Sequence, residues 1–412
     1  MGEKGRRWKC VVIWGLALAI VAVGEVVLVT MRFSENWWAD GLVGVHNVTG
    51  MGSVQCVERA CAYRWLCWTG EDDWTMVYNR ERSRPPHFLR DPNRRAGNDI
   101  PNTNLKVTAV PGHLPHVFPD AEYFRGTFAV MSRYANYNPA HILGDEVFPI
   151  FASAEEFGVQ GHVDVLYYGN GRVHGKRNTL LEKIFGFINA TLWLNWPPSF
   201  SHPVCFERVL VGWERRGFAA SRYHWEHHFL MREFRNHIWR RFGMPPSLAA
   251  RRLEAGRRLR VLFVVKDVTK AEHPHFVANL AGLMNRTRAR LPASTVTRAM
   301  WSTSTVQEQV QYMYNSDIVI AQPGADILIT FLLAPWAQLI IIPRLMLGRW
   351  ESGSNEGALW LGKSADWHAT TVPEEDVVAD GDWGTFVPPS VYDRILRDVV
   401  IDLNVLLEAN TA

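Results

Sequence analysis

The sequence has no internal repeat, no low-complexity tract and no large excess of one charge. Its composition, 47% hydrophobic and 21% charged residues, is ordinary for a globular protein and excludes disordered, collagenous and coiled-coil chains. Only one segment is apolar for long enough to cross a bilayer, which excludes a polytopic membrane protein. The length of 412 residues suggests roughly two to three domains.

Basic residues exceed acidic ones by only three over the whole chain, 44 against 41. Residues 1–9 account for this excess, since they carry Lys4, Arg6, Arg7 and Lys9 against Glu3. The remainder of the chain is balanced. We therefore expect no nucleic acid among its partners.

Residues 10–31 are apolar except for Glu25. A run of about 22 residues is long enough to span a hydrocarbon core, and the basic residues before it predict a cytoplasmic tail. We expect a signal-anchor transmembrane helix and a single-pass type II protein of the Golgi or endoplasmic reticulum membrane, with the remainder lumenal. A cleaved signal peptide ending near Gly24 is the alternative interpretation.

Cysteine is scarce, with five in the chain, and four of them follow the apolar segment. An even number on the lumenal side permits two disulfides in an oxidising compartment, but three connectivities are open. A zinc site is the weaker interpretation because the spacing is not C-x2-C. The four candidates are Cys56, Cys61, Cys67 and Cys205.

Three acceptor sequons for N-glycosylation occur in the chain. They begin at Asn47, Asn189 and Asn285. Behind a signal-anchor, they predict a glycan on at least one site.

The hydrophobic pattern divides the chain after the anchor into three parts. Residues 32–104 are turn-rich and predict a stem with a cysteine cluster. Strands and helices then alternate, which predicts an α/β fold with two Rossmann-like domains facing a cleft. We place these domains at residues 105–246 and 260–412, joined by a basic linker at 247–259.

Apolar runs and turn signals predict the individual elements. In the first domain we expect strands at Gly126–Met131, Val163–Tyr168 and Val209–Gly212, and helices at His141–Phe157 with a break at Pro149, Thr179–Ile188 and Tyr223–Phe242. In the second we expect strands at Arg260–Val265, Asp317–Ala321 and Leu339–Ile342, and helices at Phe276–Asn285, Thr305–Tyr314 and Ile327–Leu333.

His141 and Asp145 are the first candidates for chemistry. They lie four residues apart at the start of a predicted helix and therefore share one face. A His–carboxylate pair facing a cleft can deprotonate a hydroxyl acceptor. A capped helix with a surface ion pair is the alternative.

The loop Gln322–Asp326 is the second candidate. A glycine loop between a strand and a helix N-terminus presents backbone N–H groups to a phosphate. In an open α/β sheet, nucleotides bind at such loops. An ordinary β–α turn is the alternative.

Other patterns give no support for a metal or phosphate site. His224 and His228 lie four apart, but no third ligand is apparent, and Asp376 and Asp380 lack D-x-D spacing. The glycines of Gly169–Gly175 fit no nucleotide signature and indicate a flexible loop. We expect no metal.

Several blocks in order along the chain resemble glycosyltransferase family 61, the group that holds lumenal β-N-acetylglucosaminyl- and xylosyltransferases. These are Gly126–Phe128 with Asn138-x-x-His141-x-x-x-Asp145, Cys205–Gly212, Val261–Lys266, and Gln309–Ala321 with Gly324-Ala325 and Phe331–Ala337. The resemblance covers about residues 54 to 402.

The resemblance implies a GT-B-like fold and an inverting, metal-independent glycosyltransferase. The donor is expected to be a nucleotide-sugar, a UDP-sugar by preference, and the acceptor a hydroxyl of a glycan or glycoprotein. No other cofactor is implied, and the oligomeric state stays open. The implied base is His141 or Asp145, and the residues implied to hold the diphosphate are Lys266, Gln322, Gly324 and Ala325.

The sequence departs from the family pattern in the donor-binding half. Pro323 stands where the loop histidine is usual, Asp326 replaces a glycine, Lys266 replaces an arginine, and Ile341 replaces a glutamate. These departures favour a second hypothesis, a catalytically inactive lumenal protein that binds carbohydrate or acts as a scaffold.

Overall fold

The structure is a computed structural model. It describes residues 52–57, 60–70, 73–78, 106–132, 142–168, 184–196, 202–211, 227–246, 258–266, 276–351 and 367–409. The chain divides into two units, Met1–Met51 and Gly52–Ala412, and every described residue belongs to the second. The expected tail, the expected span at residues 10–31 and the sequon at Asn47 lie outside the described residues. Among the helices that are described, none has the length and apolar character needed to cross a bilayer.

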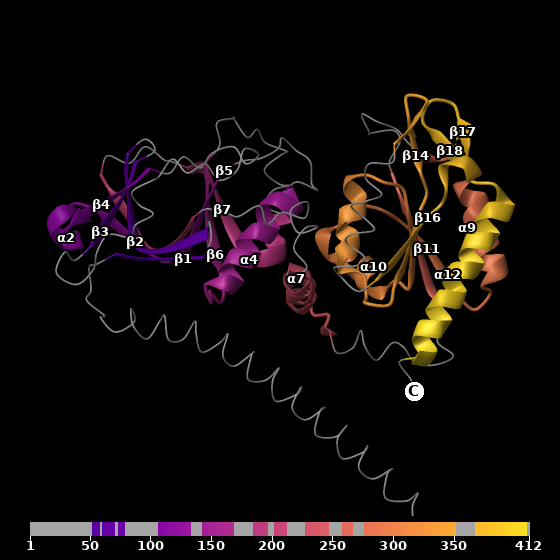
Figure 1. Ribbon diagram of the computed structural model, residues 1–412, viewed down its shortest axis with the longest axis horizontal. Coiled ribbons are helices and arrows are strands. Elements are labelled where there is room, and N and C mark those ends of the chain that lie inside the picture. The colour runs from indigo at the N-terminus through magenta and orange to yellow at the C-terminus, as the bar shows by residue number, and fades with distance from the viewer. Residues whose placement is uncertain are drawn as a thin grey trace, which may run out of the picture. The chain divides into compact units, whose positions relative to one another are not determined.

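An eight-stranded mixed sheet forms the first half of the described chain (Figure 1). Its strand order is β4-β3-β2-β8-β5-β6-β7, with β1 paired to β2. Strands β5, β6 and β7 run parallel, and β8 lies parallel to β5 and antiparallel to β2. The strands are β1 Ser53–Val57, β2 Ala60–Gly70, β3 Asp73–Tyr78, β4 Lys106–Pro111, β5 Glu122–Ser132, β6 Val163–Tyr168, β7 Ala190–Trp196 and β8 Val204–Val211.

The residues that the sequence assigns to a stem do not all lie outside this sheet. Residues 53–57, 60–70 and 73–78 form β1, β2 and β3, and β2 is a central strand paired with β8. The period-two signal of β2 is broken because Trp65 has a left-handed φ of 56°. As a result Tyr63 and Leu66, three residues apart, enter the same buried cluster.

Helices of different lengths accompany the first sheet. They are α2 Leu114–Val117, the π-helix η2 Ile142–Val147, α4 Phe148–Glu156, the 3₁₀ turn η4 Gly186–Ile188 and α7 His227–Arg241. The break expected at Pro149 occurs where η2 passes into α4, with Pro149 in the first turn of α4, because proline is tolerated there and not in a helix interior. Gly243, with φ of 74°, follows the end of α7.

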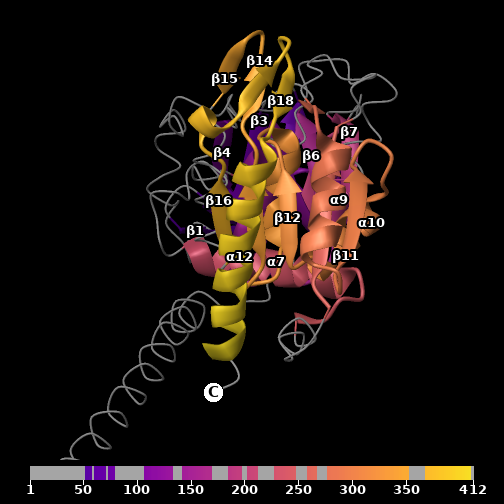
Figure 2. The same cartoon turned by 90° about the vertical axis from the view of Figure 1, so that its right-hand side faces the viewer.

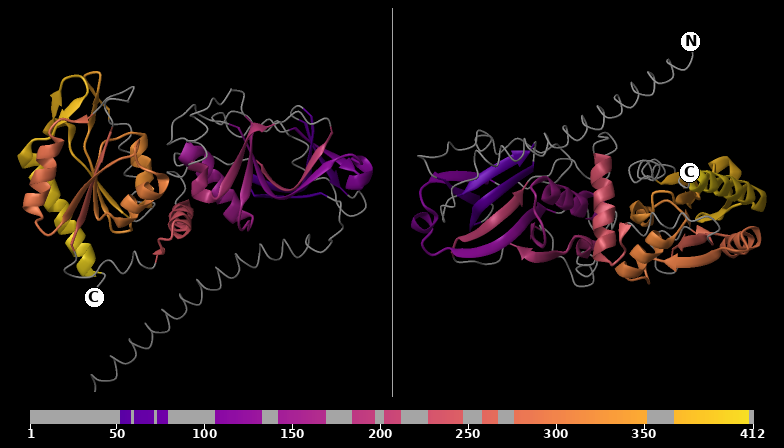
Figure 3. Two further views of the ribbon diagram at one scale, coloured as in Figure 1. Left: turned by 180° about the vertical axis from the view of Figure 1, so that it is seen from behind. Right: turned by 90° about the horizontal axis from the view of Figure 1, so that it is seen from below.

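Five parallel strands form the sheet of the second half, in the order β11-β9-β12-β13-β16. Helix α10 covers one face, and α9 and α12 cover the other (Figures 1 and 3). The strands are β9 Arg260–Val265, β11 Thr295–Met300, β12 Ile318–Ala321, β13 Gln338–Ile341 and β16 His368–Thr371, and the helices are α9 Leu280–Arg290, α10 Val306–Asn315, the 3₁₀ helix η5 Ala325–Leu332 and α12 Pro389–Ala409. The expected mixed α/β class is confirmed; the GT-B-like pairing of two domains across a cleft stays a prediction.

Two small additional sheets, one mixed and one antiparallel, border the second sheet near the upper end of β12 in Figure 2. One pairs β10 Phe276–Val277, β18 Gly384–Phe386 and β17 Val378–Asp380, and the other is the hairpin of β14 Arg344–Met346 and β15 Arg349–Glu351. We expected a helix over Phe276–Asn285. Its first two residues instead form the strand β10, and α9 starts at Leu280.

Candidate functional site

The candidate site lies at the carboxyl ends of three adjacent strands in the parallel sheet. Lys266 directly follows β9, and the loop Gln322–Gly324 follows β12. Arg344 opens β14, two residues after the buried Ile342 that ends the apolar run of β13. Since the three strands are parallel neighbours, these residues are brought to one edge of the sheet.

This edge contains the topological switch point of the sheet. In chain order the strands are arranged 2-1-3-4-5, because β11 pairs on one side of β9 and β12 pairs on the other. The chain therefore leaves β9 in one direction and leaves β12 in the other. In open α/β sheets, ligands bind outside the carboxyl ends of the strands at this point.

Gly324 is the centre of the site. Its φ of 144° and ψ of −171° fall in a region that is essentially restricted to glycine. A Cβ placed on Gly324 would lie 3.1 Å from Nζ of Lys266 and 3.3 Å from Nη1 of Arg344. Two cationic groups from separate strands thus converge over one α-carbon.

Helix η5 begins directly after Gly324, and its amino end adds to the positive character. The N–H of Ile327 donates to the carbonyl of Gly324 at 3.1 Å, which forms the first turn. The first N–H groups of a helix have no intrahelical acceptor and carry the positive end of the helix dipole. Lys266, Arg344 and these amides therefore suit an anion such as a diphosphate.

A small hydrogen-bond network fixes the loop against the neighbouring strands. Nε2 of Gln322 donates to the carbonyl of Pro343 and to Oγ1 of Thr385, each at 3.5 Å. Thr385 is buried and its hydroxyl donates to the same carbonyl at 2.9 Å. Gln322, expected to hold a diphosphate, uses its amide within the protein in this structure.

The structure brings together some of the residues that the sequence singles out and leaves others open. Lys266, Gln322 and Gly324 share the site. Ala325 is the first residue of η5, but the structure does not describe its side chain or that of Asp326. The sequence analysis did not identify Arg344 as a site residue. The signal for it is faint, namely a basic residue just after a buried parallel strand.

The structure describes little of His141 and Asp145, the pair expected on the acceptor side. His141 is outside the described residues, and Asp145 is described only by its backbone in η2. In a π-helix the hydrogen bonds run from i to i+5, so four residues no longer make a full turn. The adjacent Glu146 is 1% exposed, and π-helical turns occur frequently at functional sites.

The four cysteines that follow the apolar N-terminal segment are all oxidised, as expected. Cys56 pairs with Cys61 across the β1–β2 turn, and Cys67 pairs with Cys205 across β2 and β8. In both cases the two residues are direct partners in the strand register.

The remaining candidates are described only in part. His224 and the loop Gly169–Gly175 lie outside the described residues, as does the side chain of His228. Asp376 pairs with Arg394. In the part of the chain that the structure describes, no group of three or more His, Cys, Asp or Glu side chains could hold a metal ion.

No family model matches the sequence, and no curated protein matches it. Among solved structures, the chain is similar to an α/β-galactoside α-2,3-sialyltransferase from the luminous marine bacterium Photobacterium phosphoreum. The identity is 9%, over 72% of this chain and 90% of that chain, and the TM-score is 0.18. A score this low carries no argument about fold or activity.

Proposed function

We propose that the protein is an inverting glycosyltransferase that moves a sugar from a UDP-sugar to a hydroxyl of a glycan or glycoprotein in the secretory pathway. The observation that carries the proposal is the convergence of Lys266 and Arg344 over Gly324 at the switch point of the parallel sheet. The resemblance of the sequence blocks to family 61 supports the choice of reaction.

The proposed site supplies what a departing diphosphate needs. When the bond between the anomeric carbon and the diphosphate oxygen breaks, negative charge grows on the phosphates. Lys266, Arg344 and the leading amides of η5 are positioned before the reaction, so they stabilise that charge with little reorganisation.

The acceptor hydroxyl attacks the anomeric carbon from the face opposite the diphosphate, which inverts the configuration. Its proton passes to a general base. We assign that base to His141 or Asp145, on the sequence pattern alone. Retention of the acceptor-side block is the reason for preferring an enzyme to an inactive descendant.

Nucleotide affinity tests the proposal directly. UDP binding to the purified full chain is measured by calorimetry for the wild type, Lys266→Met and Arg344→Met. Arg349→Met is the control, since Arg349 is an exposed arginine on the neighbouring strand β15. Loss of one charge-assisted contact should weaken UDP binding by about tenfold or more in the two site variants and leave the control unchanged.

Equal UDP affinity in all four proteins would contradict the proposed donor site. Release of UDP from UDP-sugars is measured in the same preparation. A wild type that binds UDP at the site yet releases none, with or without added glycans, would favour the non-catalytic hypothesis.

A further inference from the structure

Three arginine side chains lie exposed in the middle of the eight-stranded sheet. Arg64 of β2 is directly opposite Arg208 of β8 in the antiparallel register. Arg125 lies in the bulge of β5 between Phe124 and Thr127, beside β8. Because β2, β8 and β5 are consecutive in the sheet, the arginine cluster Arg64, Arg125 and Arg208 spans three neighbouring strands.

The arrangement is electrostatically unfavourable for the protein alone. Residues directly opposite on antiparallel strands have Cβ atoms about 4.5–5.5 Å apart, and like charges in that position are destabilising. In the described part of the chain, no acidic side chain forms an ion pair with any of the three arginines. The neighbouring Glu207 uses Oε2 to accept the N–H of Gly126 at 2.9 Å.

Backbone irregularities meet at the same level of the sheet. Trp65, next to Arg64, has φ of 56°, and Gly126, next to Arg125, has φ of 112°. A left-handed conformation is strained for a bulky residue such as tryptophan. The strained backbone and the repulsion between the arginines therefore occur at the same place in the sheet. Bulges change the direction of side chains and occur often beside binding sites.

We propose that the arginine cluster binds an acidic saccharide through a carboxylate or a sulfate group. Guanidinium groups are planar forks that match such anions with two parallel hydrogen bonds. The ring of Trp65, the residue after Arg64, meets the ring of Tyr123 edge to face with centroids 6.0 Å apart, and Tyr123 is 40% exposed. An accessible aromatic side chain therefore lies on the same strands as two of the arginines. The choice of a saccharide rests on the proposed function, where it would be the acceptor; the anion site itself does not.

The test uses the full chain and three tetrasaccharide probes. Heparin tetrasaccharide carries sulfates and carboxylates, hyaluronan tetrasaccharide carries carboxylates only, and chitotetraose is neutral. Binding is measured for the wild type, Arg64→Gln, Arg208→Gln and the control Arg298→Gln. Arg298 is also an exposed strand arginine, on β11 of the other sheet.

We expect at least one acidic probe to bind the wild type and chitotetraose not to bind. Arg64→Gln and Arg208→Gln should each weaken binding about tenfold, while Arg298→Gln should match the wild type. The unliganded melting temperatures of Arg64→Gln and Arg208→Gln should not fall, since each removes a repulsion. Loss of binding therefore cannot be ascribed to unfolding.

Three outcomes would overturn the inference. They are the absence of binding by both acidic probes, equal losses in Arg298→Gln, and binding of phosphatidylserine vesicles that neither acidic probe displaces. UDP affinity is measured in the same variants and should equal that of the wild type. If the protein binds an acidic saccharide but has no affinity for UDP, the arginine site is supported and the proposed donor site is rejected.

Discussion

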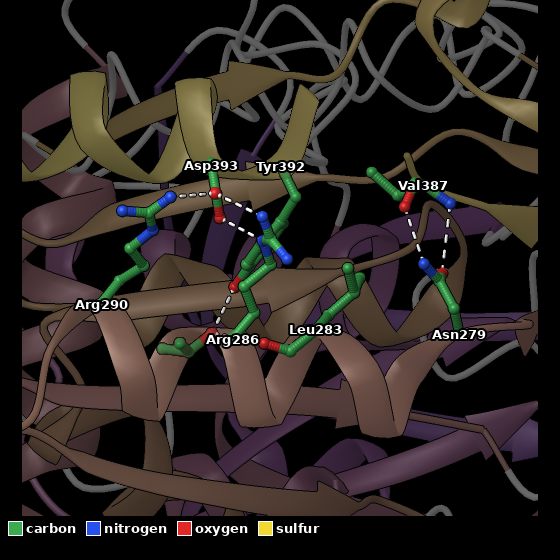
Figure 4. Close-up of polar contacts among 8 residues, drawn as sticks. Asn279, Leu283, Arg286, Arg290, Val387, Tyr392 and Asp393 are labelled. Carbon is green, nitrogen blue, oxygen red and sulfur yellow. Dashed lines mark hydrogen bonds and ion pairs between the residues drawn. The ribbon is translucent and has the colours of Figure 1, made fainter. Parts of the chain in front are cut away.

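Tyr392 of α12 and Thr287 of α9 share a hydrogen bond of 2.6 Å between their hydroxyl oxygens, in the buried contact of the two helices (Figure 4). The Thr287 hydroxyl also donates to the carbonyl of Leu283 at 2.9 Å. The Tyr392 hydroxyl is therefore the donor to Thr287. Burial raises the pKa of Tyr392 well above its ordinary value of 10.0, so the phenol stays protonated and keeps this role.

The direction of this bond predicts unequal effects for two substitutions of similar size. Tyr392→Phe removes the donor and should cost about 1 kcal/mol of unfolding free energy. Thr287→Val removes the acceptor and leaves a buried phenol hydroxyl unsatisfied, so it should cost about 1–3 kcal/mol. Urea denaturation of both variants checks the order, and a larger loss in Tyr392→Phe would contradict it.

Asp393 predicts an acid-sensitive contact between α9 and α12. Its carboxylate accepts from Arg286 at 2.6 and 2.8 Å and from Arg290 at 2.5 Å (Figure 4). Hydrogen bonds from Arg286 and Arg290 lower the pKa of Asp393 from 3.8 to about 2. A depressed native pKa stabilises the fold above the unfolded value, and this stabilisation is lost as the pH falls from about 4 through about 2.

The measurement is the unfolding free energy between pH 5 and pH 2, within the range where the chain still folds. Asp393→Asn should be less stable than the wild type at pH 5, and the difference should shrink toward pH 2. A constant difference across this range would show that the carboxylate charge does not stabilise the contact.

The three central strands of the parallel sheet are predictable from the sequence, because each is a short, mainly apolar run between turn signals. The edge strands β11 and β16 carry no such run. Strand β12 is fully apolar, β9 and β13 are apolar after their first residue, and all three were expected within one or two residues of their observed bounds. Helix α12 was not expected, although its buried residues recur at helical spacing, at Tyr392, Ile395, Leu396, Val399 and Leu403. It could have been found by a count of that period.

The site was only partly predictable, for a different reason. Gly324 is marked locally by its loop between a strand and a helix, and Lys266 by its place after a strand. Arg344 is 20 residues from Gly324 in sequence, and only the pairing of β12 with β13 brings the two together. The same holds for Arg64 and Arg208, which become neighbours only through the register of β2 and β8.

The two disulfides should differ in their contribution to stability. Cys56 and Cys61 close a short loop with a separation of 5, whereas Cys67 and Cys205 have a separation of 138. In the chain-entropy model the first contributes about 2 kcal/mol and the second about 5 kcal/mol. Denaturation of the two paired Cys→Ala variants should show the larger loss for the Cys67–Cys205 pair, and the reverse order would argue against loop entropy as the cause.

The sequons at Asn189 and Asn285 should be glycosylated to different extents. Asn189 is exposed in a left-handed turn after η4, whereas the Thr287 hydroxyl of the second sequon is buried against Tyr392. Asn285 is itself exposed, but the hydroxyl of its sequon is engaged, so we expect Asn285 to be modified mainly before α12 packs on α9. Translation with microsomes and glycopeptide mapping should find higher occupancy at Asn189, and a chain ending at residue 388 should gain occupancy at Asn285. Equal occupancy of Asn285 in both chains would contradict this order of events.

Gly324→Ala tests whether the donor site depends on the open space over this α-carbon. The added Cβ would meet Lys266 and Arg344 at 3.1 and 3.3 Å, so it should push both cations from their positions and weaken UDP binding by about tenfold or more. The positive φ also adds backbone strain of about 1–3 kcal/mol. Gly381→Ala is the matched control, since Gly381 has φ of 66° and an added Cβ there meets nothing within 4 Å.

Both glycine variants should lose stability, but only Gly324→Ala should lose UDP affinity. Asp145→Asn should bind UDP like the wild type and lower turnover by about 10² if Asp145 is, or orients, the base. Asp326→Gly should tighten UDP binding if its carboxylate faces the phosphates, because that charge opposes theirs. If Gly324→Ala binds UDP as tightly as Gly381→Ala does, the cations over Gly324 do not hold the diphosphate, and the donor must bind elsewhere on the chain.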